Sequence, residues 1–546
     1  MISIVVPLYN TPEVFLKELI NSFLKQTYPN WQLCLGDGSP EKGLYDIIAD
    51  ACGGTIDDRI VYKKLTDNTG IAGNTNQAMA LASGDFIGFT DHDDLLTPDA
   101  MYYIAKAVND NPGVQAIYSD EDKINMDGSE YFLPHFKSDF NIDLLCSHNY
   151  ITHLFVVRAD IVRETGGILS EFDGAQDHDF DLRVVEKCDR IYHIPRVLYH
   201  WRTHPESTAD HPEAKMYAYE NGRRAVENHY KRLGIPARVE QDTHLGYYRT
   251  IYEWPDTPLL SIIIPNMNHV KDLRECIDAI TEKNLYNNIE FIIVENNSDS
   301  AELTEYYESL KLRQDFTFKI VDYTKEYPDT KGIFNFSALI NYGVRQSAGQ
   351  YILLLNNDTR MINPDAISEM MGFVRRSDVG VVGARLYYGN NTVQHAGLIL
   401  GLGGVANSQF LFSGREQVGY FYRSTCVQDL SAVTGACLLT KRSLFDEVGG
   451  FDESLAVAFN DVDYCLKIRG LNKLVVYTPF SQWYHLESAS RGLDSLDEKK
   501  QRRMNEETAI FNKRWGDLLE KGDPYYNRNL SLKKFDYSFK SYDEEI

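Results

Sequence analysis

Residues 3–10 read SIVVPLYN, and residues 261–268 read SIIIPNMN. Each stretch opens on a continuous apolar, β-branched run, which is typical of a strand buried on both faces of a parallel sheet. A helix pattern follows the first run: Thr11 can cap a helix, Pro12 suits its first position, and apolar residues recur at helical spacing over 15–23. Because strand and helix patterns continue to alternate, we expect an α/β protein with its sites at the carboxyl ends of the strands.

Further matches in the same order indicate an internal duplication. The matching positions of the first and second halves are Asn76 and Asn341, Gly84 and Gly349, Asp93 and Asp358, and Gly166-Gly167 and Gly449-Gly450. We therefore expect two tandem Rossmann-like domains with mainly parallel central sheets, at residues 1–245 and 258–520. The proline-rich segment EWPDTP at 253–258 separates them. We expect the tail at 521–546 to be either a short docking segment or loosely ordered.

The composition narrows the functional classes. The 546 residues correspond to two to four domains at roughly 150 residues per domain. Asp and Glu outnumber Lys and Arg by 79 to 55, and the resulting net charge of −24 disfavours binding to nucleic acid or to anionic lipid. The eight cysteines are scattered without a CxxC pair, which disfavours a zinc cage or a disulfide framework and fits a reducing compartment.

The distribution of apolar residues bears on location. The longest apolar runs, such as YILLL at 351–355, are far shorter than the roughly 20 residues that span a bilayer. No basic or signal-type segment precedes the first strand pattern. We expect a cytoplasmic protein, or one associated peripherally with membrane-bound biosynthetic proteins at the inner face of the plasma membrane.

The strongest local signal for chemistry is an acidic cluster. Asp91, Asp93 and Asp94 follow directly after the apolar run at 86–89. Carboxylates this close repel one another unless a cation or solvent screens them, and oxygen ligands at a strand end suit Mg²⁺ or Mn²⁺. A solvated acidic turn that caps the next helix is the competing explanation.

The second half has a weaker form of this cluster. Residues 356–358 read NND, with Asp358 as the one carboxylate. We expect this half to hold its metal more weakly, or to hold only the metal that arrives with a nucleotide diphosphate. Neither GxGxxG nor GxxxxGK[ST] follows the first strand, which disfavours a dinucleotide oxidoreductase and a P-loop enzyme.

Several motifs together carry a resemblance to a known family. The first half contains VPLYN (6–10), DGS (37–39), NTG (68–70) and DHDD (91–94); the second contains ENNS (295–298), FNFS (334–337), LNNDT (355–359), GGFD (449–452) and HLESASRG (485–492). In this order the sequence resembles glycosyltransferase family two, inverting nucleotide-sugar enzymes with the GT-A fold. It is similar to the tandem transferases of bacterial rhamnan, O-antigen and capsule clusters, and the resemblance covers residues 1 to about 515.

The resemblance implies a set of donor-binding residues. Asp37 in the first half, and Glu295 with Asn296 in the second, match the positions that hold the uracil or thymine and the ribose. The full set implied for the donor is Pro7, Tyr9, Asp37, Asn68, Asp91, Pro265, Glu295, Asn296 and Asn356, with Arg202 and Arg491 as candidates to neutralise the leaving diphosphate. Gly36 stands where a second acidic residue is common in the family, and an Asx-type turn is a competing explanation for Asp37.

The resemblance also implies a catalytic base in each half. Asp177 in DHDFDLR (177–183) and Asp461 in DVDYCLK (461–467) match the family's base. An inverting transfer needs a carboxylate that accepts the proton of the acceptor hydroxyl as its oxygen attacks the anomeric carbon. A helix N-terminus, whose dipole favours anions, is the competing explanation for both motifs.

A histidine follows each acidic motif at nearly the same distance. His200 and His485 are the two, and in similar enzymes this histidine completes the metal shell or contacts the diphosphate. His204 is a rival in the first half, and an ordinary loop histidine is the competing explanation for His200. The metal-binding set is thus Asp91, Asp93, Asp94 and His200, and Asp358 and His485, for Mn²⁺ or Mg²⁺.

The function that these residues indicate is a bifunctional, metal-dependent, inverting glycosyltransferase. Each half would transfer a sugar from a UDP- or dTDP-sugar donor to an oligosaccharide or polyprenyl-linked acceptor of a bacterial surface polysaccharide. The alternative is that one half is catalytic and the other is an acceptor-binding or scaffolding module. A nucleotidyltransferase lacks support because YNTP at 9–12, after the first strand, is no Gly-rich, basic phosphate loop. A processive membrane synthase lacks support because there are no spanning segments.

Overall fold

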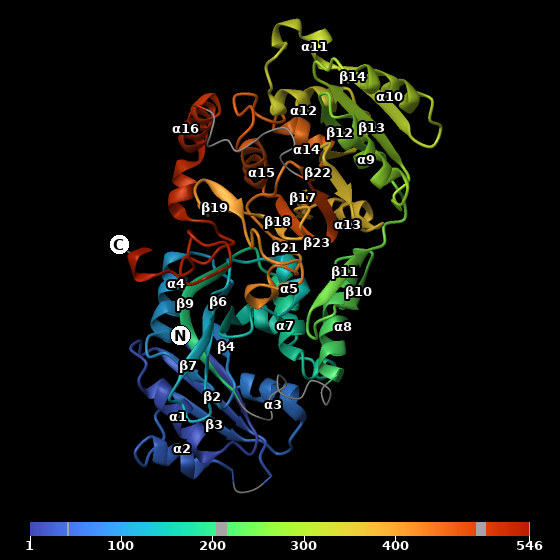
Figure 1. Ribbon diagram of the computed structural model, residues 1–546. Helices are drawn as coiled ribbons and strands as arrows, with labels where there is room; N and C mark the ends of the chain where they lie inside the picture. Colours follow the sequence, from blue (N-terminus) through green and yellow to red (C-terminus); the bar gives the residue numbers. More distant parts are fainter. Residues whose placement is uncertain (41–42, 204–215, 487–497, 545–546) are drawn as a thin grey trace. The chain divides into compact units, whose positions relative to one another are not determined.

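The computed structural model describes residues 1–40, 43–203, 216–486 and 498–544, and in it the chain divides into two compact units, 1–250 and 251–546 (Figure 1). Each unit is built on a central sheet with helices on both faces, so the expected α/β class is confirmed. Within the described residues, no helix is both long enough and apolar enough to cross a bilayer.

The first unit's sheet has the strand order β3-β2-β1-β4-β8-β6-β9-β5, with β7 paired to β6. Strands β1 to β4 run parallel, and β8 is antiparallel to both of its neighbours. The strands are β1 (Ile2–Leu8), β2 (Trp31–Asp37), β3 (Ile60–Lys64), β4 (Phe86–Phe89), β5 (Leu95–Leu96), β6 (Ala116–Ile124), β7 (Tyr131–His135), β8 (Phe155–Arg158) and β9 (Ile191–Arg202). A separate ribbon pairs β10 (Ala237–Gln241) with β11 (Tyr248–Tyr252).

Helices cover both faces of this sheet. The apolar face of α1, which contains Phe15, Leu19 and Phe23, packs with α4 against the strands in one continuous core. The helices are α1 (Glu13–Leu24), α2 (Tyr45–Ala51), α3 (Gly70–Met79), α4 (Ala100–Asp110), α5 (Ile142–Ser147), α6 (Ala159–Thr165), α7 (Gln176–Val185) and α8 (Met216–Arg232). Burial of these apolar side chains is the main force that fixes the unit.

The second unit repeats the strand order, as β14-β13-β12-β15-β22-β17-β23-β16, with β18 paired to β17 and β21 to β23. The strands are β12 (Leu260–Asn266), β13 (Ile289–Glu295), β14 (Thr317–Asp322), β15 (Tyr351–Leu355), β16 (Thr359–Met361), β17 (Val379–Tyr387), β18 (Val393–His395), β19 (Leu398–Leu400), β20 (Ala406–Ser408), β21 (Gln428–Asp429), β22 (Cys437–Lys441) and β23 (Leu474–His485). The helices are α9 (Val270–Thr281), α10 (Ala301–Lys311), α11 (Tyr323–Glu326), α12 (Phe336–Arg345), α13 (Ala366–Val374), α14 (Arg442–Glu447), α15 (Asn460–Gly470) and α16 (Glu498–Lys521). Two buried apolar clusters, one on each face of the sheet, form its core.

The residues that recur in the two halves of the sequence make the same contacts in both units. The side-chain amide of Asn76 bonds both backbone groups of Ile168, at 2.8 and 2.9 Å, and Asn341 bonds those of Phe451 in the same way, at 2.9 and 3.0 Å. Gly84 and Gly349 lie so close to the opening strand that a Cβ atom would come within 2.8 and 2.4 Å of its atoms. The duplication therefore preserves backbone contacts that only these residue types allow.

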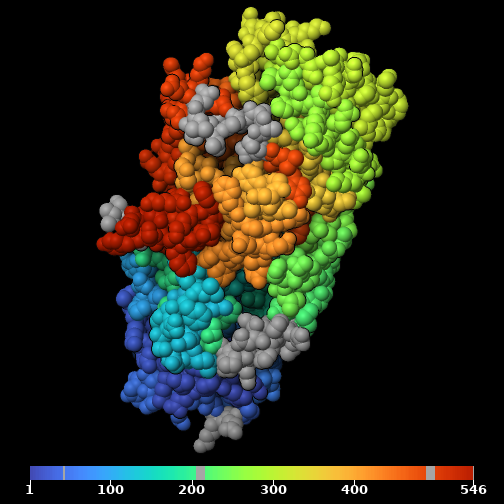
Figure 2. Space-filling model, in the orientation of Figure 1, coloured from blue at the N-terminus to red at the C-terminus, as the bar shows by residue number. Residues whose placement is uncertain are grey.

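The C-terminal segment packs on an insertion that the first unit lacks. The insertion contains β19, β20 and β21, and Asp523 accepts hydrogen bonds from Leu400 N (2.7 Å) and Ser431 Oγ (2.8 Å) within it. The ring of Tyr537 stacks on Phe410 at 5.1 Å, and its hydroxyl donates to Gln409. Figure 2 shows this red segment beside the orange insertion. Residues 523–544 thus belong to the second unit.

Candidate functional site

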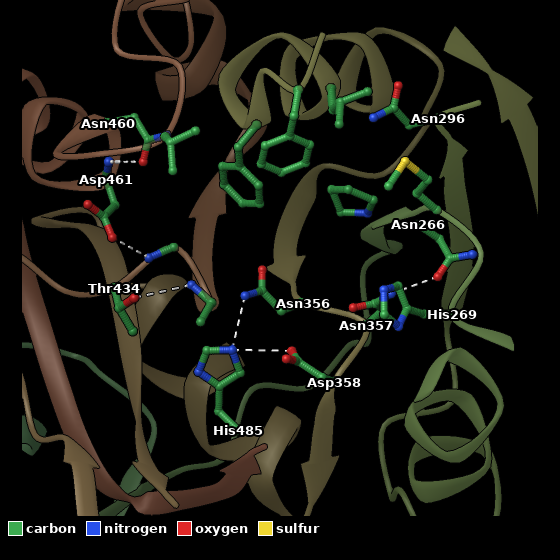
Figure 3. Close-up of a pocket in the computed structure, with 18 of the residues that line it drawn as sticks. Asn266, His269, Asn296, Asn356, Asn357, Asp358, Thr434, Asn460, Asp461 and His485 are labelled. Carbon is green, nitrogen blue, oxygen red and sulfur yellow. Dashed lines mark hydrogen bonds and ion pairs between the residues drawn. The ribbon is translucent and has the colours of Figure 1, made fainter. Parts of the chain in front are cut away.

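A pocket of about 490 Å³ opens at the carboxyl ends of the strands in the second unit (Figure 3). Its walls come from the end of β12, the NND segment after β15, the loop before β22, the start of α15 and the end of β23. The predicted residues on this wall are Pro265, Asn296, Asn356, Asp358, Asp461 and His485. Segments far apart in the sequence therefore converge on one cavity, as expected for a doubly wound sheet.

Asp358 and His485 form the cation-binding candidate of this pocket. Their Oδ1 and Nε2 atoms are 3.2 Å apart, and Asn356 Nδ2 lies 3.1 Å from the same Nε2. Nδ1 of His485 pairs with Gln394 Oε1 at 2.7 Å, so Nε2 is the ring nitrogen that faces Asp358. A lone pair and a carboxylate oxygen at this separation attract each other only through a shared proton or cation, so the donor set fits a divalent ion.

Asp461 faces the same pocket from the first turn of α15 (Figure 3). Its Oδ2 accepts a hydrogen bond from Gly435 N at 2.8 Å, and its Oδ1 accepts one from Val462 N at 2.9 Å. Burial raises the pKa of Asp461, and these backbone donors oppose the rise. The result is a fixed carboxylate with increased basicity, a suitable property for a general base.

The neighbouring Asp463 has a different role. Its oxygens pair with Lys467 Nζ at 2.8 Å, with Trp515 Nε1 at 2.9 Å and with the guanidinium of Arg514. Its side chain is fully buried and joins α15 to α16. Of the two aspartates of this motif, Asp461 is therefore the one that lines the cavity.

The opposite wall of the pocket is an amide network. Asn357 Nδ2 donates to Asn266 Oδ1 at 2.7 Å, and Asn266 Nδ2 donates to Tyr307 Oη at 3.1 Å. The same hydroxyl donates to Glu295 Oε2 at 2.6 Å, and Ser298 also bonds this carboxylate. Glu295 is thus buried and occupied by protein donors, whereas Asn296 lines the cavity. Their contact with a nucleoside remains a prediction.

The first unit has a smaller cavity of about 100 Å³ at the equivalent strand ends. Pro7, Asp91 and Asp177 are the predicted residues that line it. Ligand atoms of Asp91, Asp94 and His153 lie within 4.8 Å of one another, and in the part of the chain that is described this is the one group of three or more such side chains that could hold a metal ion. Carboxylate and imidazole ligands suit Mn²⁺ or Mg²⁺.

Burial and neighbouring charges both shift the pKa values of the residues in this group. Burial raises the pKa of Asp94 well above its ordinary value, and the nearby Asp91 and Asp93 carboxylates add to the effect. Burial lowers the pKa of His153, but the hydrogen bond and charge of Glu121 outweigh it and raise this pKa to about 9. A cation that binds here would displace the imidazole proton.

Asp177 lies at the N-terminal turn of α7 with an exposed carboxylate. Its Oδ1 accepts from His178 N at 2.8 Å, and its Oδ2 accepts from Asn149 Nδ2 at 3.3 Å. Asp181, one turn further, also lines the cavity, and burial followed by the charge of Asp177 raises its pKa well above the ordinary value. Asp179 is instead paired with Arg183 at 2.7 Å.

Two sequence predictions need correction. His200 Nδ1 pairs with Asp122 Oδ1 at 2.5 Å, and its ring packs on Tyr131, so it is held away from the Asp91 group. Arg202 is 2% exposed, and its guanidinium is bound by Asp93 O (2.7 Å) and Glu18 Oε2 (2.6 Å), among others. Arg202 therefore stabilises the acidic loop and cannot face a diphosphate in this arrangement.

The remaining predicted residues that the structure describes lie outside the two cavity linings. Asp37 is fully buried and accepts hydrogen bonds from Ser39 N, Leu44 N and Tyr62 Oη, which is the Asx-type turn considered from the sequence. Asn68 Oδ1 accepts a hydrogen bond from Gly70 N at the start of α3, and Tyr9 is exposed. Asp93 is absent from the metal group. His204 and Arg491 lie outside the described residues.

Three of the lining residues that sequence reasoning missed bear directly on metal or phosphate binding. His153 precedes β8 and comes near Asp91 only through the sheet, and no local motif marked it. Lys500 and Arg503 reach the second pocket from α16 and bring positive charge to it. Their positions in the run KKQRRM (499–504) are the signal that could have found them, because a basic run beside an acidic pocket suits a phosphate ligand.

Comparison with known families gives a direct result. The sequence profile described as glycosyl transferase family 2 matches residues 3–166 and, again, residues 261–449. The two matches fall one in each unit and together cover more than half of the chain.

Two relatives align over nearly the whole chain. An uncharacterised protein of Sinorhizobium fredii, y4gI, is 40% identical over 99% of this chain and 59% of its own length. The O-antigen biosynthesis protein RfbC of Myxococcus xanthus is 32% identical over 100% of this chain and 41% of its own length. The chain therefore spans between two fifths and three fifths of these relatives.

The solved structures that this chain resembles have low sequence identity to it. The mannosyltransferase PcManGT of Pyrobaculum calidifontis, in complex with GDP-Man and Mn²⁺, has 16% identity and a TM-score of 0.36, over 56% of this chain and 78% of its own. TarS of S. aureus has 19% identity and a TM-score of 0.33, over 41% of this chain and 38% of its own.

Proposed function

The chain belongs to glycosyltransferase family 2 and is a glycosyltransferase, and from this membership we propose that both of its units catalyse sugar transfer in the assembly of a bacterial surface polysaccharide. The observation that carries the proposal is the recurrence of one arrangement. In each unit a carboxylate at a helix N-terminus faces a carboxylate–imidazole pair across a cavity at the strand ends. The similarity to the O-antigen biosynthesis protein of M. xanthus supports O-antigen or a similar glycan as the product.

The proposed reaction is a single displacement with inversion. The acceptor hydroxyl oxygen bonds to the anomeric carbon, the bond from that carbon to the diphosphate oxygen breaks, and the hydroxyl proton passes to the base. Asp461 is the base of the second unit, because Gly435 holds it at the cavity wall and burial makes it more basic. Asp177 has the same role in the first unit. No covalent enzyme intermediate is needed.

The leaving nucleoside diphosphate needs neutralisation. Asp358 and His485 in the second unit, and the Asp91 group in the first, would hold the cation, which when bound supplies positive charge to the diphosphate. Lys500 and Arg503 add positive charge to the second pocket. These fixed charges act where negative charge develops, so they stabilise the transition state more than the bound donor.

The proposed substrates follow from the same residues. A UDP- or dTDP-sugar is the donor, with Asn296 and Asn356 on the wall where its nucleotide would lie. An oligosaccharide or polyprenyl-linked glycan is the acceptor, and peripheral association with membrane-bound biosynthetic proteins at the cytoplasmic face would bring the two together. A unit that binds acceptor without catalysis is the alternative, and the single carboxylate of the NND segment is the observation that favours it for the second unit.

A donor screen tests the proposal. The full chain is incubated with a panel of nucleotide sugars, and released nucleoside diphosphate is measured with Mn²⁺ or with excess EDTA. The proposal predicts that at least one sugar is released, that EDTA abolishes the release and that Mn²⁺ restores it. Release that persists undiminished in EDTA would contradict the metal-dependent mechanism, and release of sugar 1-phosphate would indicate nucleotidyl transfer.

A further inference from the structure

The metal-facing histidine comes from a different strand region in each unit. In the second unit it is His485, at the end of β23, which pairs with Asp358. In the first unit it is His153, in the loop before β8, which lies with Asp91 and Asp94. Strand register decides whether these two positions are equivalent, because both sheets have the same strand order.

The equivalent of His485 in the first unit is Trp201. Met361 of β16 pairs with Trp483, and Leu96 of β5 pairs with Tyr199. The hydrogen bonds one residue further along the two ladders have the same direction. Ile362 N donates to Gln482 O, and Thr97 N donates to Leu198 O. Two positions beyond these partners lie His485 and Trp201. Trp201 faces the same region as His153, with their rings 5.5 Å apart.

His200 is correspondingly equivalent to Tyr484. Both side chains point to the other side of the strand: His200 contacts Tyr131 and Asp122, and Tyr484 donates to Asn391. Successive residues of a strand face opposite sides of its sheet, so this orientation follows from register.

The equivalent of His153 in the second unit is Ala436. Arg158 of β8 pairs with Phe86, and Lys441 of β22 pairs with Tyr351, at the first residues of the equivalent strands β4 and β15. Five positions before Arg158 and Lys441 lie His153 and Ala436. The histidine and the non-ligating residue have therefore exchanged places between the two units.

The groups that orient each imidazole have exchanged as well. His153 Nδ1 lies 3.5 Å from Glu121 Oε2, whereas His485 Nδ1 lies 2.7 Å from Gln394 Oε1. The residue equivalent to Glu121 is Leu386, because Glu121 pairs with His135 and Leu386 with His395. Gln394 precedes His395, and Pro134 precedes His135, so neither unit keeps the other's orienting group.

We propose that the two units bind their divalent cation through imidazoles at non-equivalent positions, His153 oriented by Glu121 in the first and His485 oriented by Gln394 in the second. The proposal rests on the proposed metal dependence and adds to it the ligand set of each unit. A metal-bound histidine needs a partner for its other ring nitrogen. A change in the position of the histidine therefore requires a change of the residue that orients it, as in the pairs His153–Glu121 and His485–Gln394.

Mn²⁺ binding to the full chain, measured by electron paramagnetic resonance of free Mn²⁺, tests the proposal without an activity readout. In a D358N/H485A background, which leaves the first unit's site, His153→Ala is expected to weaken Mn²⁺ binding at least 10-fold. His200→Ala is the matched control and is expected to leave binding unchanged. His153→Gln, with circular dichroism of each variant, separates a loss of ligand from a loss of folding.

Transplanting the histidine gives the sharper test. Trp201→His is expected to restore Mn²⁺ binding to the His153→Ala variant, and Ala436→His is expected to restore it to His485→Ala when the first site is removed by D91N/H153A. Binding lost in His200→Ala but kept in His153→Ala and His153→Gln would overturn the exchange. Absence of Mn²⁺ binding in the unaltered chain would instead contradict the metal dependence on which the exchange rests.

Discussion

Gly435 donates its backbone N–H to Asp461 Oδ2 over 2.8 Å, and this bond fixes the carboxylate that faces the second pocket. The loop that carries Gly435 precedes β22, whereas Asp461 lies in the first turn of α15, so the bond joins two elements that are distant in the sequence. It also connects the position of the base to its acidity, because a donor to the ionised form lowers a pKa that burial has raised.

This balance predicts a pH dependence for the second unit. The base acts only when ionised, so transfer is expected to rise as pH rises through the elevated pKa of Asp461 and then to level off. The Thr434 hydroxyl also bonds Asp461 and lowers its pKa. Thr434→Val is therefore expected to shift the acidic limb of kcat/KM to higher pH.

The measurement is a pH profile of transfer by the Asp177→Asn variant, which isolates the second unit. Thr304→Val, on the exposed side of α10, is the control and should leave the profile in place. A profile that does not move with Thr434→Val would show that this hydroxyl does not tune the base.

His395 is expected to position the loop that contains Thr434 and Gly435. Its Nδ1 donates to Ala384 O at 2.9 Å, and its Nε2 accepts from Thr434 N at 3.1 Å. Burial lowers its pKa to about 4, so the neutral ring keeps this acceptor over the working range of pH. His395→Leu removes the acceptor beside Gly435 and is expected to lower kcat of the second unit by about 10- to 100-fold with little change in KM.

A parallel rise in KM, or a loss of folded protein in circular dichroism, would argue that His395 only supports the fold. His395→Gln offers a replacement hydrogen-bonding group and is expected to recover part of kcat.

Gln394 is expected to control metal affinity from outside the ligand set. Gln394→Leu removes the acceptor for His485 Nδ1, so the ring loses its fixed tautomer and orientation. Mn²⁺ binding to the second unit should weaken by about 10- to 100-fold, measured by titration in a D91N/H153A background. Gln417→Leu, in the insertion loop, is a suitable control, and an equal loss in both variants would count against the orienting role.

Arg202 is expected to contribute to stability rather than to donor binding. Arg202→Ala leaves Asp93 O and Glu18 without this buried guanidinium. Because Glu18 is partly exposed, the expected loss is that of buried hydrogen bonds, about 1–3 kcal/mol in the free energy of unfolding. Denaturant unfolding of the variant measures this cost, with the exposed Arg196→Ala as control. Unchanged stability together with a large rise in donor KM would restore the diphosphate contact expected from the sequence.

The fold was predictable because its signals are local. The buried runs at 3–6 and 261–264, the recurring polar positions and the helix patterns each depend on residues close in the sequence. Asn76 and Gly84 recur because they make backbone contacts that few other residue types can make. The C-terminal segment was harder, since its aromatic side chains have no period and find their partners on an insertion far earlier in the chain.

The sequence predicted residues of the candidate site only where a recognisable motif also lies at the end of a strand or the start of a helix. Asp177, Asp358, Asp461 and His485 line the cavities because each lies in the first turn of a helix, at the end of a strand or just after one. His200 failed as a metal ligand because the sequence does not reveal which side of β9 it faces, and one residue of register separates it from Trp201. His153 was missed because only the pairing of β4 with β8 brings it near Asp91.

The most direct test of two transferase centres is product analysis with each base removed in turn. The unaltered chain, Asp177→Asn and Asp461→Asn are incubated with acceptor, Mn²⁺ and the active donors, and the added sugars are identified by mass spectrometry. If both units are transferases, the unaltered chain adds both sugars, and each variant loses a different transfer while retaining the other. If one variant abolishes all transfer and the other changes nothing, only one unit is catalytic, which would contradict the presence of two transferase centres.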